Sequence, residues 1–348
     1  MRIWTVAAVI AFLLLSGCSH NETAKESVKN KEISKVEKPP KSKGEYPYYF
    51  PLTGKGSQTS TDGRAVAVMI NNHPKARPQS GLNKADIVYE VLAEGDITRF
   101  LAVFQSEKPT NIGPVRSARD YYIELAKGLH ALYVAHGSSP KAQEMMKSGY
   151  IDSLDGMVYD GTLFKRASFR KPPHNSYITY ENILKGVKLK NYSMDQTPPA
   201  FKFYTEEESK NISGEDAASV TVNYYSNKSF QDTYQYDPSI GRYKRFAGGE
   251  QTIDLETKDP ILLDNIFIVE MHHQVVDSSG HRAIDLTSGG NAYLLQKGKF
   301  NRVEWKNDNG RIIPVKDGKE VPFVQGKTWV NVIPTDPGLA KSVQLSVK

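Results

Sequence analysis

Residues 112–140 read IGPVRSARDYYIELAKGLHALYVAHGSSP, and this stretch decides the fold. Ser117 is a good helix N-cap, and Asp120 three positions later completes a pattern like a capping box. A helix should therefore begin here and end at the Lys-Gly pair that follows. The apolar run at residues 131–136 then predicts a buried strand. Two helix starts with a strand between them, in about 30 residues, are typical of a βαβ unit.

The segments on either side extend this unit. Ser139 followed by Pro140 marks the second helix start, because proline is favoured at the first helical position. Residues 64–72, RAVAVMINN, are too short and too β-branched for a helix and predict another buried strand. The sequence therefore predicts an α/β domain, a mixed sheet with helices, over residues 47–195.

Residues 85–106 predict a β-hairpin that turns at a Gly-Asp pair. Counting outward from the turn places Arg99 opposite Leu92 and diagonal to both Glu90 and Glu94, within reach of long side chains. In this register one face is nearly all apolar and the other is mixed. The charged face indicates either a structural ion pair on a partly covered sheet or a carboxylate pair that lines a cleft.

Beyond residue 220 the pattern changes to short alternating strands. Asp-Pro, Gly-Gly and Asn-Gly pairs recur roughly every ten residues, and few runs have helical spacing. A polar segment with two adjacent prolines precedes this region. The sequence therefore predicts a second domain, mainly antiparallel β, over residues 196–348.

The N-terminus reads MRIWTVAAVIAFLLLSGCSH and has the three parts of a lipoprotein signal. Arg2 provides the positive charge, the apolar run is too short for a permanent membrane helix, and the sequence LSGC ends the run. We expect a signal peptide over residues 1–17 and lipidation of Cys18 with diacylglycerol and palmitate. The alternative is an ordinary signal peptide with a chance cysteine.

Residues 18–46 are rich in Lys, Glu, Ser and Pro and predict a disordered tether. Cys18 is the only cysteine of the chain, so disulfides are excluded. We expect a protein anchored by lipid to the extracytoplasmic face of the cell membrane. The net charge of +6 favours an anionic envelope ligand or protein partner, whereas export makes nucleic acid an unlikely partner.

Arg116 and Arg119 flank the first predicted helix start. A helix N-terminus already presents free N–H groups and a positive dipole, so two guanidinium groups would make it a strong receptor for carboxylate or phosphate. The positive charges of the same arginines are unfavourable at the positive end of the helix dipole, which indicates that a negatively charged partner offsets them. That partner is either an external anion or an internal carboxylate such as Glu90 or Glu94; a solvated face is the remaining alternative.

The other candidate ligand-binding residues follow the strand at residues 131–136. His136 ends that strand and Ser138 follows it, at the edge where open α/β sheets bind ligands. His174 and Asn175 lie in a long basic loop that either closes over this edge or is simply solvated. A serine nucleophile at Ser138 is disfavoured, because the GxSxG elbow is absent.

No catalytic residue, metal site or cofactor is assigned from the sequence. Glu270, His272 and His273, followed by His281, resemble a ligand cluster, but their spacing is not a recognised zinc pattern. In a strand Glu270 and His272 share one face and His273 lies on the other, so three ligands would meet only if His281 folded back across the turn.

Five motifs together resemble the YerB-like family of bacterial lipoproteins, for which no activity is established. They are RPQSGLNKADIVYEVLAEGDITRFLAVF (77–104), IGPVRSAR (112–119), HGSSP (136–140), PHNSYIT (173–179) and GKTWVNVIP (326–334). The resemblance implies an N-terminal α/β domain and a C-terminal β-rich domain, and it implies that the Glu, Arg and His candidates share a site. The family pattern has Gly-Gly-Ser-Pro where this chain has a second serine, Ser138, so it does not require that hydroxyl.

Three functions follow as hypotheses. The first is a non-enzymatic lipoprotein that binds an anionic ligand or partner through its α/β domain. The second is an envelope hydrolase of a phosphodiester or glycan, with Glu90 or Glu94 as general base and His136 or His174 as general acid. The third is an interaction scaffold in which the charged cluster, including Arg99, is purely structural.

Overall fold

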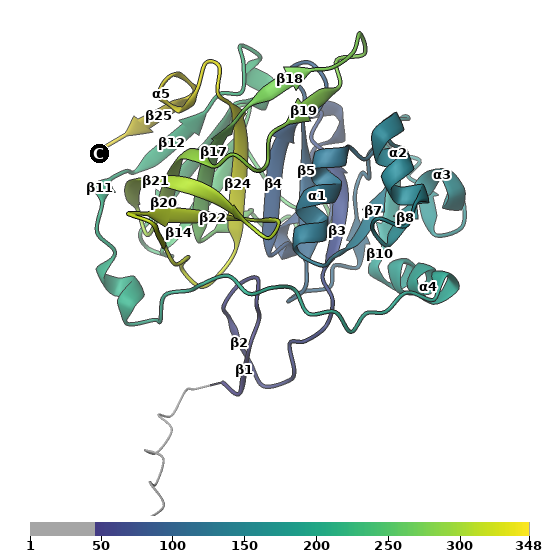
Figure 1. Cartoon of the computed structure of the whole chain (residues 1–348), viewed down its shortest axis with the longest axis horizontal. Coiled ribbons are helices and arrows are strands. Elements are labelled where there is room, and N and C mark those ends of the chain that lie inside the picture. Colours follow the sequence, from purple (N-terminus) through teal and green to yellow (C-terminus); the bar gives the residue numbers. More distant parts are fainter. Residues whose placement is uncertain (1–45, 348) are drawn as a thin grey trace, which may run out of the picture. The chain divides into compact units, whose positions relative to one another are not determined.

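A twelve-stranded mixed sheet runs through the part of the chain that the structure describes, residues 46–347 of a computed structural model (Figure 1). Along the sheet the strands follow the order β23-β22-β21-β20-β17-β24-β4-β5-β3-β7-β8, and β11 pairs with β21. The signal peptide and tether predicted for residues 1–46 lie outside the described residues, except Tyr46. No helix within residues 46–347 is long and apolar enough to cross a membrane.

The first part of the chain supplies one half of this sheet and most of the helices. Its strands are β1 (Tyr48–Tyr49), β2 (Gly56–Ser57), β3 (Val66–Asn71), β4 (Ile87–Leu92), β5 (Thr98–Phe104), β6 (Asn111–Ile112), β7 (Leu132–Ala135), β8 (Ser153–Asp155), β9 (Phe164–Arg166) and β10 (Ser176–Thr179). Its helices are α1 (Asp120–Gly128), α2 (Pro140–Lys147), α3 (Gly156–Tyr159) and α4 (Tyr180–Lys190).

The second part is almost entirely β. Its strands are β11 (Glu215–Asp216), β12 (Ser219–Val222), β13 (Asp232–Asp237), β14 (Arg242–Ala247), β15 (Glu250–Gln251), β16 (Leu262–Leu263), β17 (Asn265–Met271), β18 (His273–Val275), β19 (Arg282–Ile284), β20 (Gly290–Gln296), β21 (Lys299–Asp308), β22 (Arg311–Lys316), β23 (Lys319–Glu320), β24 (Thr328–Pro334) and β25 (Val343–Ser346). One short helix, α5 (Leu339–Ser342), precedes the last strand.

The predicted fold class is confirmed. In the first part β3, β7 and β8 are parallel neighbours while β3, β5 and β4 are antiparallel, so this half of the sheet is mixed. In the second part most pairings are antiparallel. Strand β24 is parallel to both β17 and β4, so it joins the two halves into one sheet. The domain boundary predicted near residue 195 stays a prediction, and the sheet runs across it.

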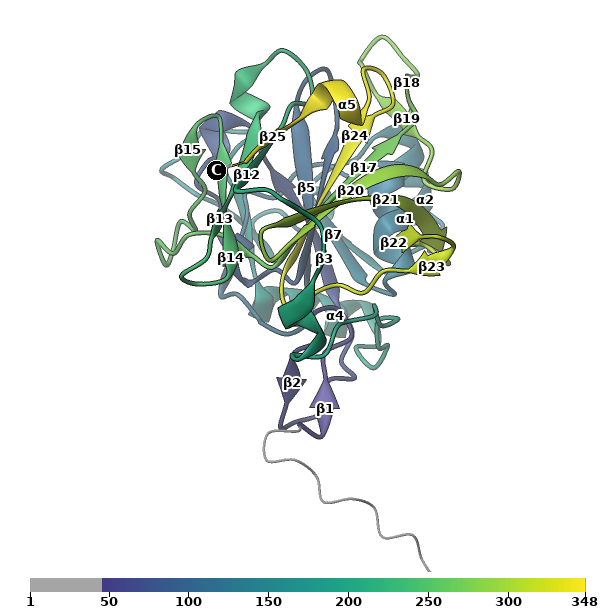
Figure 2. The ribbon, with the colours of Figure 1, turned by 90° about the vertical axis from the view of Figure 1, so that its left-hand side faces the viewer.

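The sheet is covered differently on its two faces. On one, the α1 face, Tyr121, Ile123 and Leu125 of helix α1 pack with Tyr89 and Leu101 of the sheet. The other face, the α4 face, is covered by two elements (Figure 2). One is helix α4, and the other is a smaller antiparallel sheet made of β12–β16 and β25. Both faces are apolar, which explains why β3, β4 and β5 are buried along their whole length.

One of the two predicted helix starts is confirmed and the other is wrong. Ser139 caps α2 by accepting a hydrogen bond from the Ala142 amide, and Pro140 is the first helical residue. Helix α1 begins two residues later than the sequence pattern suggests, because its N-cap is Arg119 and not Ser117. The backbone of the Arg116–Ala118 segment is instead held by neighbouring strands, with the Arg116 amide donating to Met69 and the Ala118 amide to Gly137.

Helix α1 ends where it touches the second part of the chain. A Cβ atom on Gly128 would lie 2.3 Å from the backbone carbon of Gly310, in the turn between β21 and β22. We therefore expect Gly128→Ala to lower the free energy of unfolding by about 1–3 kcal/mol, as overpacking typically does. The measurement is urea unfolding followed by tryptophan fluorescence.

Gly63→Ala is the matched control, because no atom lies within 4 Å of its Cβ position. Equal stability of the two variants would show that the contact between the two glycines is loose.

Candidate functional site

The register of the β4–β5 hairpin places Glu90 and Arg99 on opposite faces of the sheet, although the sequence pattern predicts that they lie close together. Arg99 is paired with Val91 and Glu90 with Phe100, one residue away from the predicted register, so the prediction of Leu92 opposite Arg99 is wrong. Side chains alternate between faces along a strand, and a one-residue slip exchanges the faces of one strand relative to the other. Glu90 therefore lies on the α4 face with Phe100, whereas Arg99 lies on the α1 face near Tyr122.

On the α1 face, Glu94 holds two arginines. Its carboxylate accepts from Arg99 Nη2 at 2.6 Å and forms an ion pair with Arg119. Both arginine side chains are nearly buried, 4% and 7% exposed, whereas Glu94 is 24% exposed. Nη1 of Arg99 donates to the backbone carbonyl of Ser117, and Nη1 of Arg119 donates to that of Ala118. Two of the candidate arginines are therefore paired with the chain's own carboxylate and share its single negative charge.

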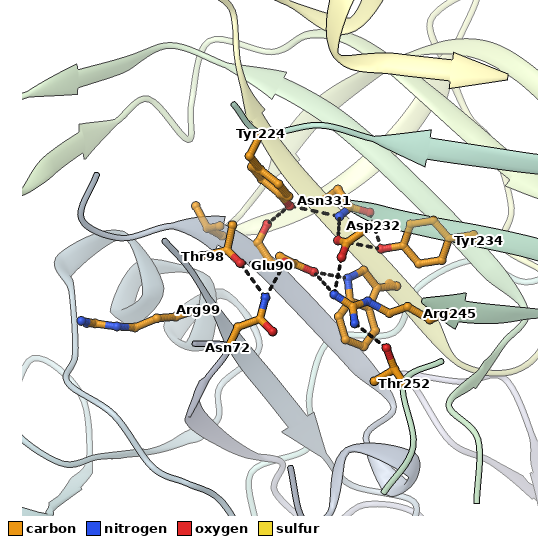
Figure 3. Close-up of polar contacts among 12 residues, drawn as sticks. Asn72, Glu90, Thr98, Arg99, Tyr224, Asp232, Tyr234, Arg245, Thr252 and Asn331 are labelled. Atoms are coloured by element: carbon orange, nitrogen blue, oxygen red, sulfur yellow. Dashed lines mark hydrogen bonds and ion pairs between the residues drawn. The ribbon is translucent and has the colours of Figure 1, made fainter. Parts of the chain in front are cut away.

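On the α4 face, Glu90 belongs to a buried cluster that the sequence did not reveal (Figure 3). Its carboxylate, fully buried, accepts from Arg245 Nη2 at 2.8 Å and from Trp329 Nε1 at 3.1 Å. It also accepts from Asn72 Nδ2 and Thr98 Oγ1. The Arg245 guanidinium carbon lies 4.3 Å from the centre of the Trp329 ring, which adds a cation–π contact.

The second carboxylate of this cluster is Asp232. Arg245 Nη2 donates to it at 2.6 Å, and Asn331 Nδ2 donates at 3.0 Å. Tyr234 and Tyr224 complete the network through Asn331, as Figure 3 shows. Burial raises the pKa of Asp232 well above its usual range, and nearby Glu90 adds to the rise. The cluster connects β4, β13, β14 and β24 beneath the surface. Its role is therefore to hold these strands together and not to bind a ligand.

Arg116 stands apart from both clusters. Among the described residues, the only hydrogen bond of its side chain is a long one, 3.4 Å, from Nη1 to the Pro173 carbonyl. Within residues 46–347 no carboxylate forms an ion pair with it. Burial and nearby Arg99 lower the pKa of Arg116 to about 10. Unlike Arg99 and Arg119, this half-buried cation lacks an acidic partner in the described part of the chain.

Two stacked histidines lie beside Arg116. The rings of His73 and His174 are 4.6 Å apart and nearly parallel. Burial lowers the pKa of both, and the charge of Arg116 adds to the lowering in each case. His73 Nδ1 accepts from the Lys75 amide, and His174 Nδ1 accepts from Asn71 Nδ2. A neutral ring that accepts at Nδ1 carries its proton on Nε2, so each ring keeps one N–H donor.

His136 and Asn175 form a third group around Arg166. Arg166 donates from Nη2 to His136 Nε2 at 2.8 Å and from Nη1 to Asn175 Oδ1 at 3.2 Å. The His136 proton must then lie on Nδ1, which is 2.8 Å from Ser176 Oγ. Both ring nitrogens are occupied, and burial lowers the pKa of this histidine.

Ser138 makes a backbone bridge to Ala118, and within residues 46–347 no hydrogen bond joins its hydroxyl to a histidine.

The structure thus distributes eight of the nine predicted site residues, all except Ser138, over four places. Glu94, Arg99 and Arg119 are together; Arg116 and His174 are together; His136 and Asn175 meet through Arg166; and Glu90 is buried apart from all of them. Four partners were missed from the sequence, namely His73, Arg166, Asp232 and Arg245. Of these, only His73 carried a usable signal, since it directly follows the strand at residues 64–72. Within the described residues no group of three or more His, Cys, Asp or Glu side chains is arranged to hold a metal ion.

The comparisons with known proteins agree with this architecture. Residues 52–193 match the N-terminal domain of a protein family of unknown function (DUF3048), and residues 220–330 match its C-terminal domain. The chain is 44% identical over 338 residues to "Putative lipoprotein YerB" of Bacillus subtilis (strain 168), covering 96% of both chains. A crystal structure of the YerB protein from Bacillus subtilis superposes with a TM-score of 0.80 at 47% identity, over 86% of this chain and 99% of that one. The resemblance to the YerB-like family is therefore confirmed, and the chain belongs to the DUF3048 family, with both of its domains present.

Proposed function

We propose that this protein is a lipoprotein, anchored through Cys18 on the extracytoplasmic face of the membrane, that binds an anionic group at Arg116, His73 and His174. The lipobox supports the anchor, and a relative that covers nearly the whole chain is itself named a lipoprotein. The observation that carries the binding site is Arg116, a half-buried guanidinium with no carboxylate partner within residues 46–347.

The chemistry of the three side chains suits a phosphate or carboxylate. A guanidinium presents paired N–H donors that match two oxygens of such a group. The Nε2–H groups of His73 and His174 add two neutral donors. The exposed Lys75 lies two residues from His73 and adds positive charge. An anion bound here would relieve the repulsion among these groups.

The hydrolase alternative has less support. Glu90 is buried on the opposite face of the sheet, and Glu94 is neutralised by two arginines, so neither is free to act as a general base beside Arg116. His136 has both ring nitrogens in hydrogen bonds. The residues assigned to proton transfer in that hypothesis do not face one open site.

The proposal predicts that inorganic phosphate binds to the protein and shifts the imidazole NMR signals of His73 and His174. We expect Arg116→Ala to weaken this binding tenfold or more, because a charge-assisted hydrogen bond is lost. We also expect binding to strengthen once the pH falls below the ordinary histidine pKa of about 6.5, because both histidines have lowered pKa values and gain charge only there, where inorganic phosphate is already mainly the monoanion.

The matched control is Arg302→Ala, because Arg302 is an exposed arginine in an ion pair with Glu215. Acetate in place of phosphate tests whether a carboxylate is accepted as well. Unchanged phosphate affinity in Arg116→Ala would rule out the site.

A further inference from the structure

An exposed aromatic patch lies where the described chain begins. Tyr46, Tyr48 and Tyr49 are 45%, 45% and 47% exposed, and the last two form strand β1 of the small β1–β2 hairpin. Beside them is a hollow of about 440 Å³ whose lining includes Phe50, Pro198 and Phe203. Single exposed apolar residues are common on soluble proteins, but a contiguous aromatic patch indicates an interaction surface.

Helix α4 extends this patch with leucines and lysines. Leu184 and Leu189 are 43% and 69% exposed, and Lys185, Lys188 and Lys190 are exposed next to them. Figures 1 and 2 both place α4 on the same side of the molecule as the β1–β2 hairpin. The two elements lie close together, because Phe50, which directly follows β1, and Leu184 of α4 line one hollow of about 320 Å³.

The charges on α4 are unbalanced. Its only acidic residue is Glu181, which is 2.7 Å from Lys185 in an ion pair, and this leaves Lys188 and Lys190 without an acid on the same helix. A helix with exposed leucines and basic side chains is typical of a surface that lies on an anionic membrane. Tyrosine suits the same location, since its ring is apolar and its hydroxyl stays hydrated.

We propose that the β1–β2 hairpin and helix α4 form a docking face that lies on an anionic lipid surface. The position of the face supports a membrane as the occupant, because Tyr46 follows Cys18 by only 28 positions. A tether of the kind that the sequence predicts for these residues would span roughly 30 Å, and the resulting effective concentration would let a weak intrinsic affinity suffice. The tethering part of this argument rests on the lipidation proposed above, whereas the affinity of the face itself does not.

The test uses the unlipidated chain, residues 18–348 with Cys18→Ser, and flotation with vesicles of phosphatidylcholine with or without phosphatidylglycerol. We expect several-fold more protein on the vesicles that contain phosphatidylglycerol, with less binding at high salt. The variant with Lys185, Lys188 and Lys190 changed to glutamine, and the variant Tyr48→Ser with Tyr49→Ser, should each lose most of this binding while unfolding at an unchanged temperature.

Two controls make the outcome decisive. Changing Lys306, Lys316 and Lys319, which are exposed on β21–β23, to glutamine alters the net charge equally and should leave binding unchanged. Arg116→Ala should also leave it unchanged, because the proposed anion site is not part of the docking face. Equal loss in the two lysine variants, loss only in Arg116→Ala, or no preference for phosphatidylglycerol would each overturn the docking face.

Discussion

Replacing Arg245 with methionine should lower the free energy of unfolding by about 3–5 kcal/mol, the cost expected when one partner of a buried ion pair is removed. Arg245 is 1% exposed and is held by Glu90 and Asp232, both fully buried. Methionine fills a similar volume but leaves two carboxylates without a cation. The variant also loses the contact with the Trp329 ring. Urea unfolding followed by tryptophan fluorescence measures the change.

The control comes from the same strand. Arg242 pairs with Asp264 at 3.1 Å, but its side chain is 26% exposed, so Arg242→Met should cost about 1 kcal/mol or less. Adding Glu90→Gln and Asp232→Asn to Arg245→Met should recover part of the loss, because the uncompensated charges disappear. If Arg245→Met costs no more than Arg242→Met, the buried cluster contributes little to stability.

This cluster also shows why the sequence revealed only part of the site. Strands β3 and β7 and the start of α2 were predictable, because each depends on neighbours within a few positions. The Glu90–Arg245 pair joins residues 155 positions apart, and no local period records such a contact. Arg245 lies in a strand that alternates buried and half-buried residues, and nothing in that alternation distinguishes a buried arginine from an exposed one.

The candidate site near Arg116 was half predictable for the same reason. The local pattern pointed to Arg116 and Arg119 as a pair, since both flank a helix start. The hairpin register decides which of them is paired with a carboxylate. With Arg99 on the α1 face, Glu94 reaches Arg99 and Arg119 together and leaves Arg116 without a carboxylate among the described residues. A one-residue difference in pairing thus separates a structural arginine from a candidate ligand-binding one.

The pairing of Glu94 with Arg99 and Arg119 predicts that Glu94→Gln lowers the free energy of unfolding substantially. The amide keeps the shape of the side chain but removes the charge that both nearly buried arginines face, so we expect a loss of about 2–3 kcal/mol in the free energy of unfolding. Asp96→Asn, in the same turn, should change stability by less than about 0.5 kcal/mol, since Asp96 forms no ion pair within residues 46–347. Urea unfolding of both variants is the measurement.

The loss of stability in Glu94→Gln has two possible causes, the missing negative charge and a changed shape of the turn. Added phosphate distinguishes between them. If Glu94 acts by neutralising Arg99 and Arg119, an external anion should take its place, and phosphate should stabilise Glu94→Gln more than it stabilises the parent chain. The comparison belongs in an Arg116→Ala background, where the proposed anion site is absent. A loss of stability that phosphate does not repair would mean that Glu94 is needed for the shape of the turn. Repair would show that Arg99 and Arg119 need a negative charge beside them, whichever group supplies it.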